Sequence, residues 1–251
     1  RLQQADFQSL SASEFNLVEK LARQVKLPLP QIQGRRTQSG VRGARIHWAK
    51  TLQEASRQDG DILSLPRLQR KQQDLPLLIL VDISGSMERY ARLLLAFLHQ
   101  ATRGTPRQVF AFGTDLTDLN RAFKLRDTDD MLAAASAQIQ DFAGGTQLGK
   151  SLTQFRTQHA RNLMGRRTVV LLISDGLDTG AKETLDSELA WLKRHTRSLL
   201  WLNPLLRFEG YAPIATGASV LNRHVDGMLA IHNLSRLEEL ASALSKLLKS
   251  H

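Results

Sequence analysis

The sequence contains no cysteine, and this absence removes several kinds of chemistry at once. Without cysteine there is no disulfide, no thiolate metal ligand and no cysteine nucleophile. Long apolar runs are also missing: stretches such as residues 77–81 and 169–173 hold about five residues, whereas a membrane-spanning helix needs about twenty. The amino terminus shows no secretory signal pattern. These absences favour a cytoplasmic protein without a transmembrane segment.

Two further patterns that would indicate an enzyme or a zinc site are lacking. The seven histidines are scattered, and no two of them have the close spacing of a zinc-binding pair. No Gly-x-Ser-x-Gly elbow, the turn that carries the nucleophile of many hydrolases, occurs in the chain. We therefore expect a protein that is not an enzyme.

Acidic residues are fewer than basic ones: 24 Asp and Glu against 34 Lys and Arg, a net charge of +10. Such a balance suits an acidic partner, a nucleic acid or an anionic membrane surface. The basic residues concentrate at residues 35–45, 67–71, 161–167 and 193–197. No aromatic residues interleave with these clusters, as they would on a surface that stacks bases. We interpret the clusters mainly as solvated faces and regard nucleic-acid binding as the lesser hypothesis.

The first 74 residues contain one predicted helix and a polar stretch. Ser11 and Glu14 have the spacing of a capping box, and apolar residues at helical spacing follow, so a helix is predicted to about residue 26, before two prolines. Residues 31–74 are polar, basic and punctuated by glycine. We predict an irregular basic arm there, with one short helical or extended piece near residues 46–55.

From residue 77 onward, buried strands alternate with helices. The predicted strands are residues 77–81, 107–112, 116–120, 168–173, 198–202 and 228–231. The predicted helices are residues 87–102, 129–140, 148–156, 182–195 and 235–248. This alternation indicates an α/β fold with a mostly parallel central sheet between two layers of helices, a three-layer α/β/α arrangement. We expect two parts: residues 1–74, the amino-terminal helix and arm, and residues 75–251, the α/β domain.

A motif of oxygen-bearing side chains follows the first buried strand. Asp82 supplies a carboxylate, and Ser84 and Ser86 supply hydroxyls. In a loop that leaves a strand with alternating side chains, three such oxygens can converge on one point, and Gly85 permits a tight turn. Ligands of an open parallel sheet bind at this carboxyl edge of the strands. The motif therefore predicts a site for a hard cation.

Two more oxygen donors follow later in the chain, in segments predicted to reach the same edge. Thr146 comes after a pair of glycines, and Asp175 follows the apolar strand at residues 168–173. Thr146 also stands where it could cap the helix predicted at residues 148–156. A donor set made of hydroxyls and carboxylates selects Mg²⁺, Mn²⁺ or Ca²⁺ over zinc, and the small number of carboxylates favours Mg²⁺.

Together, these motifs resemble the metal-ion-dependent adhesion site (MIDAS) of von Willebrand factor A (VWA) domains. The resemblance implies that Ser84, Ser86 and Thr146 are inner ligands of the cation. It implies that Asp82 and Asp175 act mostly through water. In that family a free coordination position accepts a carboxylate from a partner protein, so the resemblance also implies a docking site.

Further segments narrow the resemblance to the CoxE-like branch of VWA proteins. They are residues 84–92, 109–114, 174–178 and 201–205. Members of that branch are accessory proteins encoded beside MoxR-type AAA+ ATPases. Some are implicated in inserting or maturing the metal centre of molybdenum-type carbon monoxide dehydrogenase. The resemblance therefore implies an adaptor or chaperone that works with such an ATPase and with a metalloenzyme client.

A competing pattern overlaps the same region. Residues 144–151 match the phosphate-binding pattern G-x-x-x-x-G-K-[ST], with Lys150 as its lysine. That chemistry needs the loop to follow a buried strand, but the preceding residues 129–140 are predicted to be a helix. The glycines and Thr146 are also already explained by the cation site. We therefore regard nucleotide binding here as improbable.

The leading hypothesis is a non-enzymatic, Mg²⁺-dependent protein-interaction module, with an acidic residue of the partner completing the cation site. The alternative is a nucleic-acid-binding protein that uses its basic arm, with a purely structural cation site. The dependence of binding on salt and on EDTA separates the two hypotheses.

Overall fold

The computed structural model describes residues 6–7, 10–25, 27, 31–139, 145–207 and 212–249. Its contacts divide the chain into two compact units, Arg1–Leu29 with Pro76–His251, and Pro30–Leu75. The amino-terminal helix thus groups with the carboxy-terminal part of the chain, whereas we had expected it to stand with the arm. Within the described residues, no helix is both long and apolar enough to cross a bilayer.

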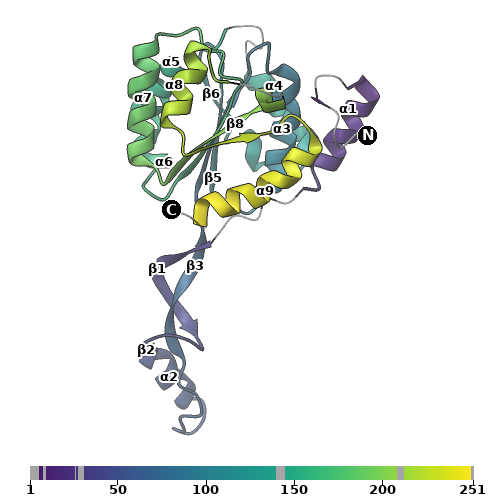
Figure 1. Ribbon diagram of the computed structural model, residues 1–251. Helices are drawn as coiled ribbons and strands as arrows, with labels where there is room; N and C mark the ends of the chain where they lie inside the picture. Colours follow the sequence, from purple (N-terminus) through teal and green to yellow (C-terminus); the bar gives the residue numbers. More distant parts are fainter. Residues whose placement is uncertain are drawn as a thin grey trace. The chain divides into compact units, whose positions relative to one another are not determined.

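The larger unit is built on a six-stranded sheet (Figure 1). The order across the sheet is β6 (Leu116–Asp118), β5 (Arg107–Phe112), β4 (Leu77–Asp82), β7 (Val169–Ile173), β8 (Ser198–Asn203) and β9 (Gly227–Ala230). All neighbours are parallel except the edge strand β6, which is antiparallel to β5. The expected α/β fold with a mostly parallel sheet is confirmed.

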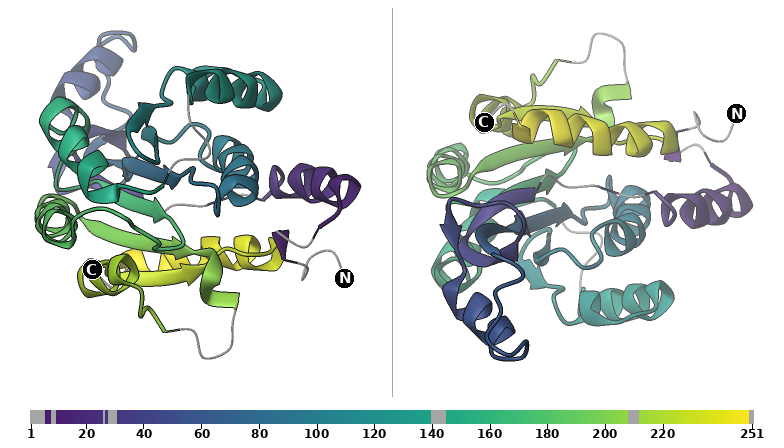
Figure 2. Two further views of the ribbon diagram at one scale, coloured as in Figure 1. Left: turned by 90° about the horizontal axis from the view of Figure 1, so that it is seen from above. Right: turned by 90° about the horizontal axis from the view of Figure 1, so that it is seen from below.

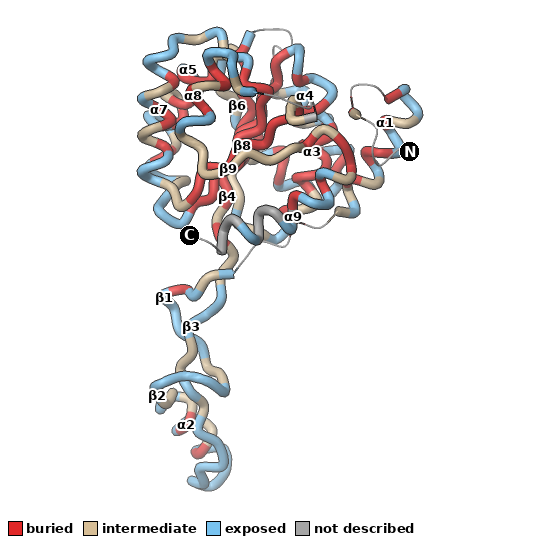
Figure 3. The backbone as a smooth tube through the Cα atoms, viewed as in Figure 1, coloured by how far each residue is buried: buried red, intermediate tan, exposed pale blue. Residues whose placement is uncertain are grey.

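The central strands are apolar because both of their faces are covered. Every residue of β4, β7 and β8 is buried (Figure 3). In β4, Leu78 and Leu80 join a core cluster with residues of α5 (Leu148–Gln158), α7 (Lys182–His195) and α8 (Thr216–His224). Because side chains alternate along a strand, Leu77, Ile79 and Val81 point to the opposite face. Continuous apolar strands are the expected pattern for such a sheet.

Helices lie on both faces of the sheet (Figure 2). On one side are α5, α7 and α8, and on the other are α3 (Glu88–Ala101) and α9 (Leu234–Lys249). α3 also contacts α4 (Thr128–Gln138). The remaining short elements are the 3₁₀ turns η2 (Ala122–Lys124) and η3 (Pro204–Arg207) and helix α6 (Ala160–Leu163). The sequence did not predict α8, whose nine residues are too few to show a clear helical period.

The first helix, α1 (Ala12–Ala22), begins as its sequence indicates. The Ser11 backbone amide donates to Glu14 Oε2 at 3.0 Å, and the Glu14 amide donates to Ser11 Oγ at 3.4 Å. This reciprocal capping box satisfies amides that the helix leaves without an internal partner. The helix buries Phe15 and Val18 and contacts α3 and α9. It ends four residues before the expected position.

The smaller unit is more regular than its composition suggested. β1 (Gln31–Gly40) and β3 (Arg67–Asp74) form an antiparallel ribbon, and β2 (Arg45–Ile46) pairs with β3. The short helix α2 (Trp48–Ala55) agrees with the piece expected near residues 46–55. The expectation of an irregular arm is wrong for the two strands. Nearly all of their residues are polar and exposed or only partly buried, so the strands lack the apolar alternation by which strands are recognised.

Candidate metal site

Asp82 is the last residue of β4, at the centre of the carboxyl edge of the sheet. Its carboxylate is fully buried, between the ends of β5 and β7. The Ser84 backbone amide donates to Asp82 Oδ1 at 2.9 Å, which closes a tight turn after the strand. The Met87 amide then donates to the Ser84 carbonyl at 2.8 Å, immediately before α3 begins. The turn thus holds the carboxylate and the following hydroxyls on the same side of the sheet edge.

The two loop serines lie side by side. Their hydroxyl oxygens are 3.3 Å apart. Ser84 is buried, whereas Ser86 is exposed to solvent. Together with Asp82 they present one carboxylate and two hydroxyls, as the sequence predicted, and the group opens to solvent at Ser86.

Thr146 reaches the same point from a distant part of the chain. It is buried, and its hydroxyl lies 3.4 Å from both carboxylate oxygens of Asp82. The residue at the N-cap of α5 is Gln147, so Thr146 does not cap this helix. That expectation is wrong, and the Thr146 hydroxyl is directed at Asp82 instead. Asp141–Gly144, the segment before Thr146 that the sequence motif includes, lies outside the described residues.

Asp175 brings the second carboxylate. It follows β7, is buried, and accepts a hydrogen bond from the Leu177 amide at 3.0 Å through Oδ1. Its charge lies close enough to Asp82 to raise the pKa of that residue. The five residues predicted from the sequence, Asp82, Ser84, Ser86, Thr146 and Asp175, therefore gather at one edge of the sheet.

The sequence analysis missed Ser174. Its hydroxyl donates to Asp82 Oδ2 at 2.8 Å and accepts from the Gly176 amide at 3.0 Å. The Trp201 indole, on β8, donates to the Ser174 carbonyl at 2.8 Å. Ser174 thus fixes the Asp82 carboxylate from the β7 side. The only signal in the sequence was its position beside Asp175, which gave no reason to choose it.

The turn after Asp175 leaves no room for a side chain at Gly176. Gly176 has φ +81°, in the left-handed region that favours glycine. A Cβ on Gly217 of α8 would lie 2.6 Å from the Gly176 carbonyl oxygen. α8 therefore packs directly on the turn that carries the second carboxylate, which explains why a helix with little sequence signal matters to the site.

The electrostatics of the site favour a bound cation. The pKa of Asp82 is raised to about 6, mainly by burial and to a smaller extent by the nearby charge of Asp175. The hydrogen bonds from Ser84 and Ser174 act in the opposite direction and lower this pKa. Among the described residues, neither Asp82 nor Asp175 forms an ion pair with a lysine or arginine. Two buried carboxylates with no cationic side chain are costly unless a metal ion compensates them. The donor set, carboxylates and hydroxyls, fits a hard divalent cation.

Asp178, in the loop after β7, is half-buried and caps α5. Its Oδ1 accepts from the Leu148 amide at 2.8 Å. The Thr179 amide and hydroxyl both donate to the Thr146 carbonyl, at 2.8 and 2.9 Å. The loop after β7 therefore holds both the start of α5 and the backbone of Thr146.

Removing this cap should weaken the domain. We expect Asp178→Ala to cost about 1 kcal/mol, a typical loss for a helix cap, and to lower the melting temperature by about 2–4 °C. Asp61→Ala, at an exposed position of the smaller unit, is the control and should leave the melting temperature unchanged. Thermal denaturation followed by circular dichroism measures both. Equal melting temperatures for the two variants would show that the Leu148 amide is satisfied by water.

The phosphate-binding pattern does not have the structural context that it needs. Lys150 lies in α5, and its ammonium forms an exposed ion pair with Asp115 at 2.7 Å. The described segment before the loop is α4, a helix, rather than a buried strand. Gly144, the first glycine of the pattern, lies outside the described residues. These contacts favour the interpretation that Lys150 is a surface residue.

No alternative metal cluster competes with the candidate site in the part of the chain that the structure describes. There, no group of three or more His, Asp or Glu side chains is arranged to hold a metal ion. The candidate site is not a group of this kind, because only two of its donors are carboxylates. Its remaining donors are hydroxyls.

The comparisons with known proteins agree with this fold. A family model described as "VWA domain containing CoxE-like protein" matches residues 17–237. No curated protein matches the chain significantly.

Several solved structures match part of the chain, each with a TM-score below 0.5. A von Willebrand factor type A protein from Catenulispora acidiphila is 17% identical with a TM-score of 0.47, and the match covers 72% of this chain and 44% of that one. Proximal thread matrix protein 1 from the mussel byssus, with a zinc-occupied MIDAS motif, is 14% identical with a TM-score of 0.44, covering 70% and 48%. The protein BatB from Bacteroides thetaiotaomicron is 17% identical with a TM-score of 0.43, covering 70% and 99%. The match thus spans less than half the length of the first two proteins.

Proposed function

The chain belongs to the family of CoxE-like proteins that contain a VWA domain, and we propose that it is a non-enzymatic, cation-dependent protein-interaction module. One observation carries the proposal. A buried carboxylate, Asp82, stands at the carboxyl edge of the sheet with the hydroxyls of Ser84 and Thr146 beside it, and no lysine or arginine of the described residues pairs with it. Such an arrangement is suited to holding a metal ion at a surface that a partner can reach.

The proposed ion is Mg²⁺, with Mn²⁺ or Ca²⁺ as alternatives. Ser84, Ser86 and Thr146 would hold it through their hydroxyls, and Asp82 and Asp175 would act mostly through water. When bound, the ion supplies an acceptor position for a carboxylate of another protein. The exposure of Ser86 supports access to this position, and the burial of Asp82, Ser84 and Thr146 supports a fixed geometry.

The proposed partners are a MoxR-type AAA+ ATPase and a metalloenzyme client in the cytoplasm. Membership of the CoxE-like family supports this part of the proposal. The chain would act as an adaptor during maturation of an enzyme of the carbon monoxide dehydrogenase type. An acidic residue of the partner would complete the cation site.

The charge of the chain supports an acidic partner. The net charge is +10, and residues 30–75 contribute nine Lys and Arg against four Asp and Glu. A basic surface raises the rate at which an acidic protein is encountered, and this effect falls as salt increases. Strong binding to arbitrary DNA that falls steeply with salt and is indifferent to EDTA would instead favour the nucleic-acid alternative.

Partner capture tests the proposal. The purified chain, immobilised in Mg²⁺, should capture an ATPase of the MoxR type from native lysate and release it in EDTA, with mass spectrometry as the readout. Asp82→Ala should lose the capture, because it removes the carboxylate to which the site is anchored. Lys150→Ala is the matched control and should keep it, since Lys150 contacts only Asp115 among the described residues. Loss of capture with Lys150→Ala, or capture that survives EDTA, would contradict the docking mechanism.

A further inference from the structure

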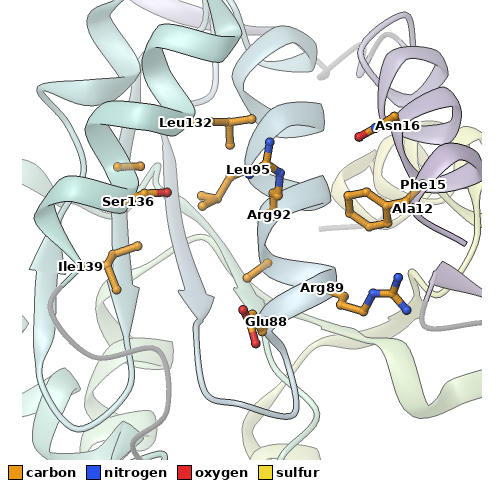
Figure 4. Close-up of a pocket in the computed structure, with 12 residues that line it drawn as sticks. Ala12, Phe15, Asn16, Glu88, Arg89, Arg92, Leu95, Leu132, Ser136 and Ile139 are labelled. Atoms are coloured by element: carbon orange, nitrogen blue, oxygen red, sulfur yellow. The ribbon is translucent and has the colours of Figure 1, made fainter. Parts of the chain in front are cut away.

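A groove of about 400 Å³ lies between three helices of the larger unit (Figure 4). Its walls are the first turn and a half of α1, one face of α3 and the carboxy-terminal half of α4. The lining positions of α3 run from Glu88 to Leu95, and those of α4 and its C-cap run from Leu132 to Ile139. Both sets have the three- and four-residue spacing of a single helical face.

The floor of the groove is apolar. Phe15, Leu95, Leu132 and Ile139 line it, each with less than a tenth of its surface exposed. Large apolar side chains that surround an open volume gain stability when another apolar group displaces water from it. The groove is therefore suited to one large apolar side chain, or two small ones, of a ligand.

The rim carries positive charge. Arg89 and Arg92 of α3 line the groove together with one acidic residue, Glu88. The Arg92 guanidinium contacts Glu19 Oε2 at 3.4 Å, yet 59% of its side chain stays exposed. Arg89 lies over the ring of Phe15, 5.8 Å from its centroid, and donates to the Leu10 carbonyl. Two fixed guanidinium groups beside an apolar floor favour a ligand segment that combines an apolar side chain with acidic ones.

One end of the groove lies at the start of α3, the helix that directly follows the Ser84 and Ser86 loop in the chain. Glu88 stands two residues after Ser86, and Figure 4 shows Glu88 and Ile139 at one end and Leu95 and Leu132 at the other. The seven steps along the helix from Glu88 to Leu95 span about 10 Å. Three residues of an extended peptide span a similar length, about 10 Å. A peptide with its carboxylate at the cation can therefore reach the floor of the groove within three or four residues.

We propose that this groove is the second half of the docking site and that it receives a large apolar side chain of the partner, three or four residues away from the acidic residue that completes the cation site. The inference rests on the proposed function and specifies the chemistry of the partner segment. The amino-terminal helix α1, which lies outside the sheet and its covering layers, supplies one wall and so contributes to the choice of partner.

A displayed library of random twelve-residue peptides tests the proposal. Peptides are selected on the immobilised protein in Mg²⁺ and eluted with EDTA. We expect them to carry an Asp or Glu three or four positions from a Leu, Ile, Phe or Trp. In a synthetic peptide of that pattern, replacing the apolar residue by serine should weaken binding at least tenfold, measured by fluorescence anisotropy.

Variants of the protein test the groove itself. Ser136→Trp and, independently, Asn16→Trp place an indole at exposed positions on opposite walls, and each should weaken the same peptide at least tenfold. The matched control, Ser187→Trp on α7, should bind it normally. All three variants should keep the rise in melting temperature that Mg²⁺ causes, because none touches the cation ligands.

The possible failures are distinguishable. Peptides that share an acidic residue but no apolar position, or equal affinity in the groove variants and the control, would overturn the groove proposal and leave the cation-dependent docking in place. If no peptide is eluted by EDTA and Mg²⁺ does not stabilise the protein, both the proposed function and the groove proposal are wrong.

Discussion

The double substitution Ser84→Ala with Ser86→Ala should abolish the rise in melting temperature that Mg²⁺ causes in the unmodified protein. A ligand at one hundred times its dissociation constant stabilises the folded state by about 2.7 kcal/mol. For a chain of this size that corresponds to about 5–10 °C. The two hydroxyls lie 3.3 Å apart beside a buried carboxylate, and alanine offers no oxygen in their place. Scanning calorimetry with and without Mg²⁺ measures the difference.

A matched pair of serines provides the control. Ser187 and Ser219 lie on α7 and α8, and among the described residues each hydroxyl donates to a carbonyl of its own helix and to no other group. Ser187→Ala with Ser219→Ala should therefore keep the full rise. An unchanged rise in the Ser84 and Ser86 variant would show that the ion binds elsewhere on the chain.

The substitution Asp82→Asn should have opposite effects with and without metal. In EDTA at pH 7.5 we expect it to stabilise the protein, by about 3 kcal/mol at most. The reason is that the pKa of Asp82 is raised by burial to about 6, from about 3.9 in an unfolded chain, and each unit is worth about 1.4 kcal/mol. The amide keeps the shape of the carboxylate without its buried charge. In saturating Mg²⁺ the same substitution should remove the stabilisation by the ion.

The sign of the pH dependence follows from the direction of the shift. A carboxyl whose pKa is higher in the folded state favours folding while it is protonated, and this contribution is lost as the pH rises from about 4 to about 6. The advantage of Asp82→Asn in EDTA should therefore be complete above pH 6, about half as large at pH 5 and absent below pH 4. Urea denaturation at these pH values measures it. A variant less stable than the unmodified protein at pH 7.5 in EDTA would show that the charged carboxylate is already compensated without metal.

The fold was largely predictable because its central strands are covered on both faces. β4 and β7 read as unbroken apolar runs, LLILV and VVLLI, and such runs between amphipathic helices indicate a parallel sheet. The family could also be recognised, since the Asp82-x-Ser84-x-Ser86 motif comes directly after one of these runs. By contrast, the strands β1 and β3 have no apolar face. Their sequences therefore do not alternate between apolar and polar residues, and they indicated no regular structure.

The clusters of basic residues show that sequence order alone does not reveal which aromatic side chains lie near them. No aromatic residue interleaves with residues 161–167 or 193–197. In the folded domain, however, Trp191 stacks on His195 and lines a cavity of about 310 Å³ with Arg161 and Arg166. For residues 161–167 the aromatic side chain comes from another helix, α7, so only the packing of the folded domain reveals it.

The sequence by itself determined the chemistry of the candidate site. The side chains and their positions after apolar strands are properties of the chain, and they were sufficient to predict Asp82, Ser84, Ser86, Thr146 and Asp175. The tertiary structure decided which neighbouring groups hold these side chains in place. Ser174 bonds Asp82, Asp178 rather than Thr146 caps α5, and α8 packs on the turn at Gly176. These relations depend on distances between segments up to 92 residues apart, and local sequence patterns carry no information about such distances.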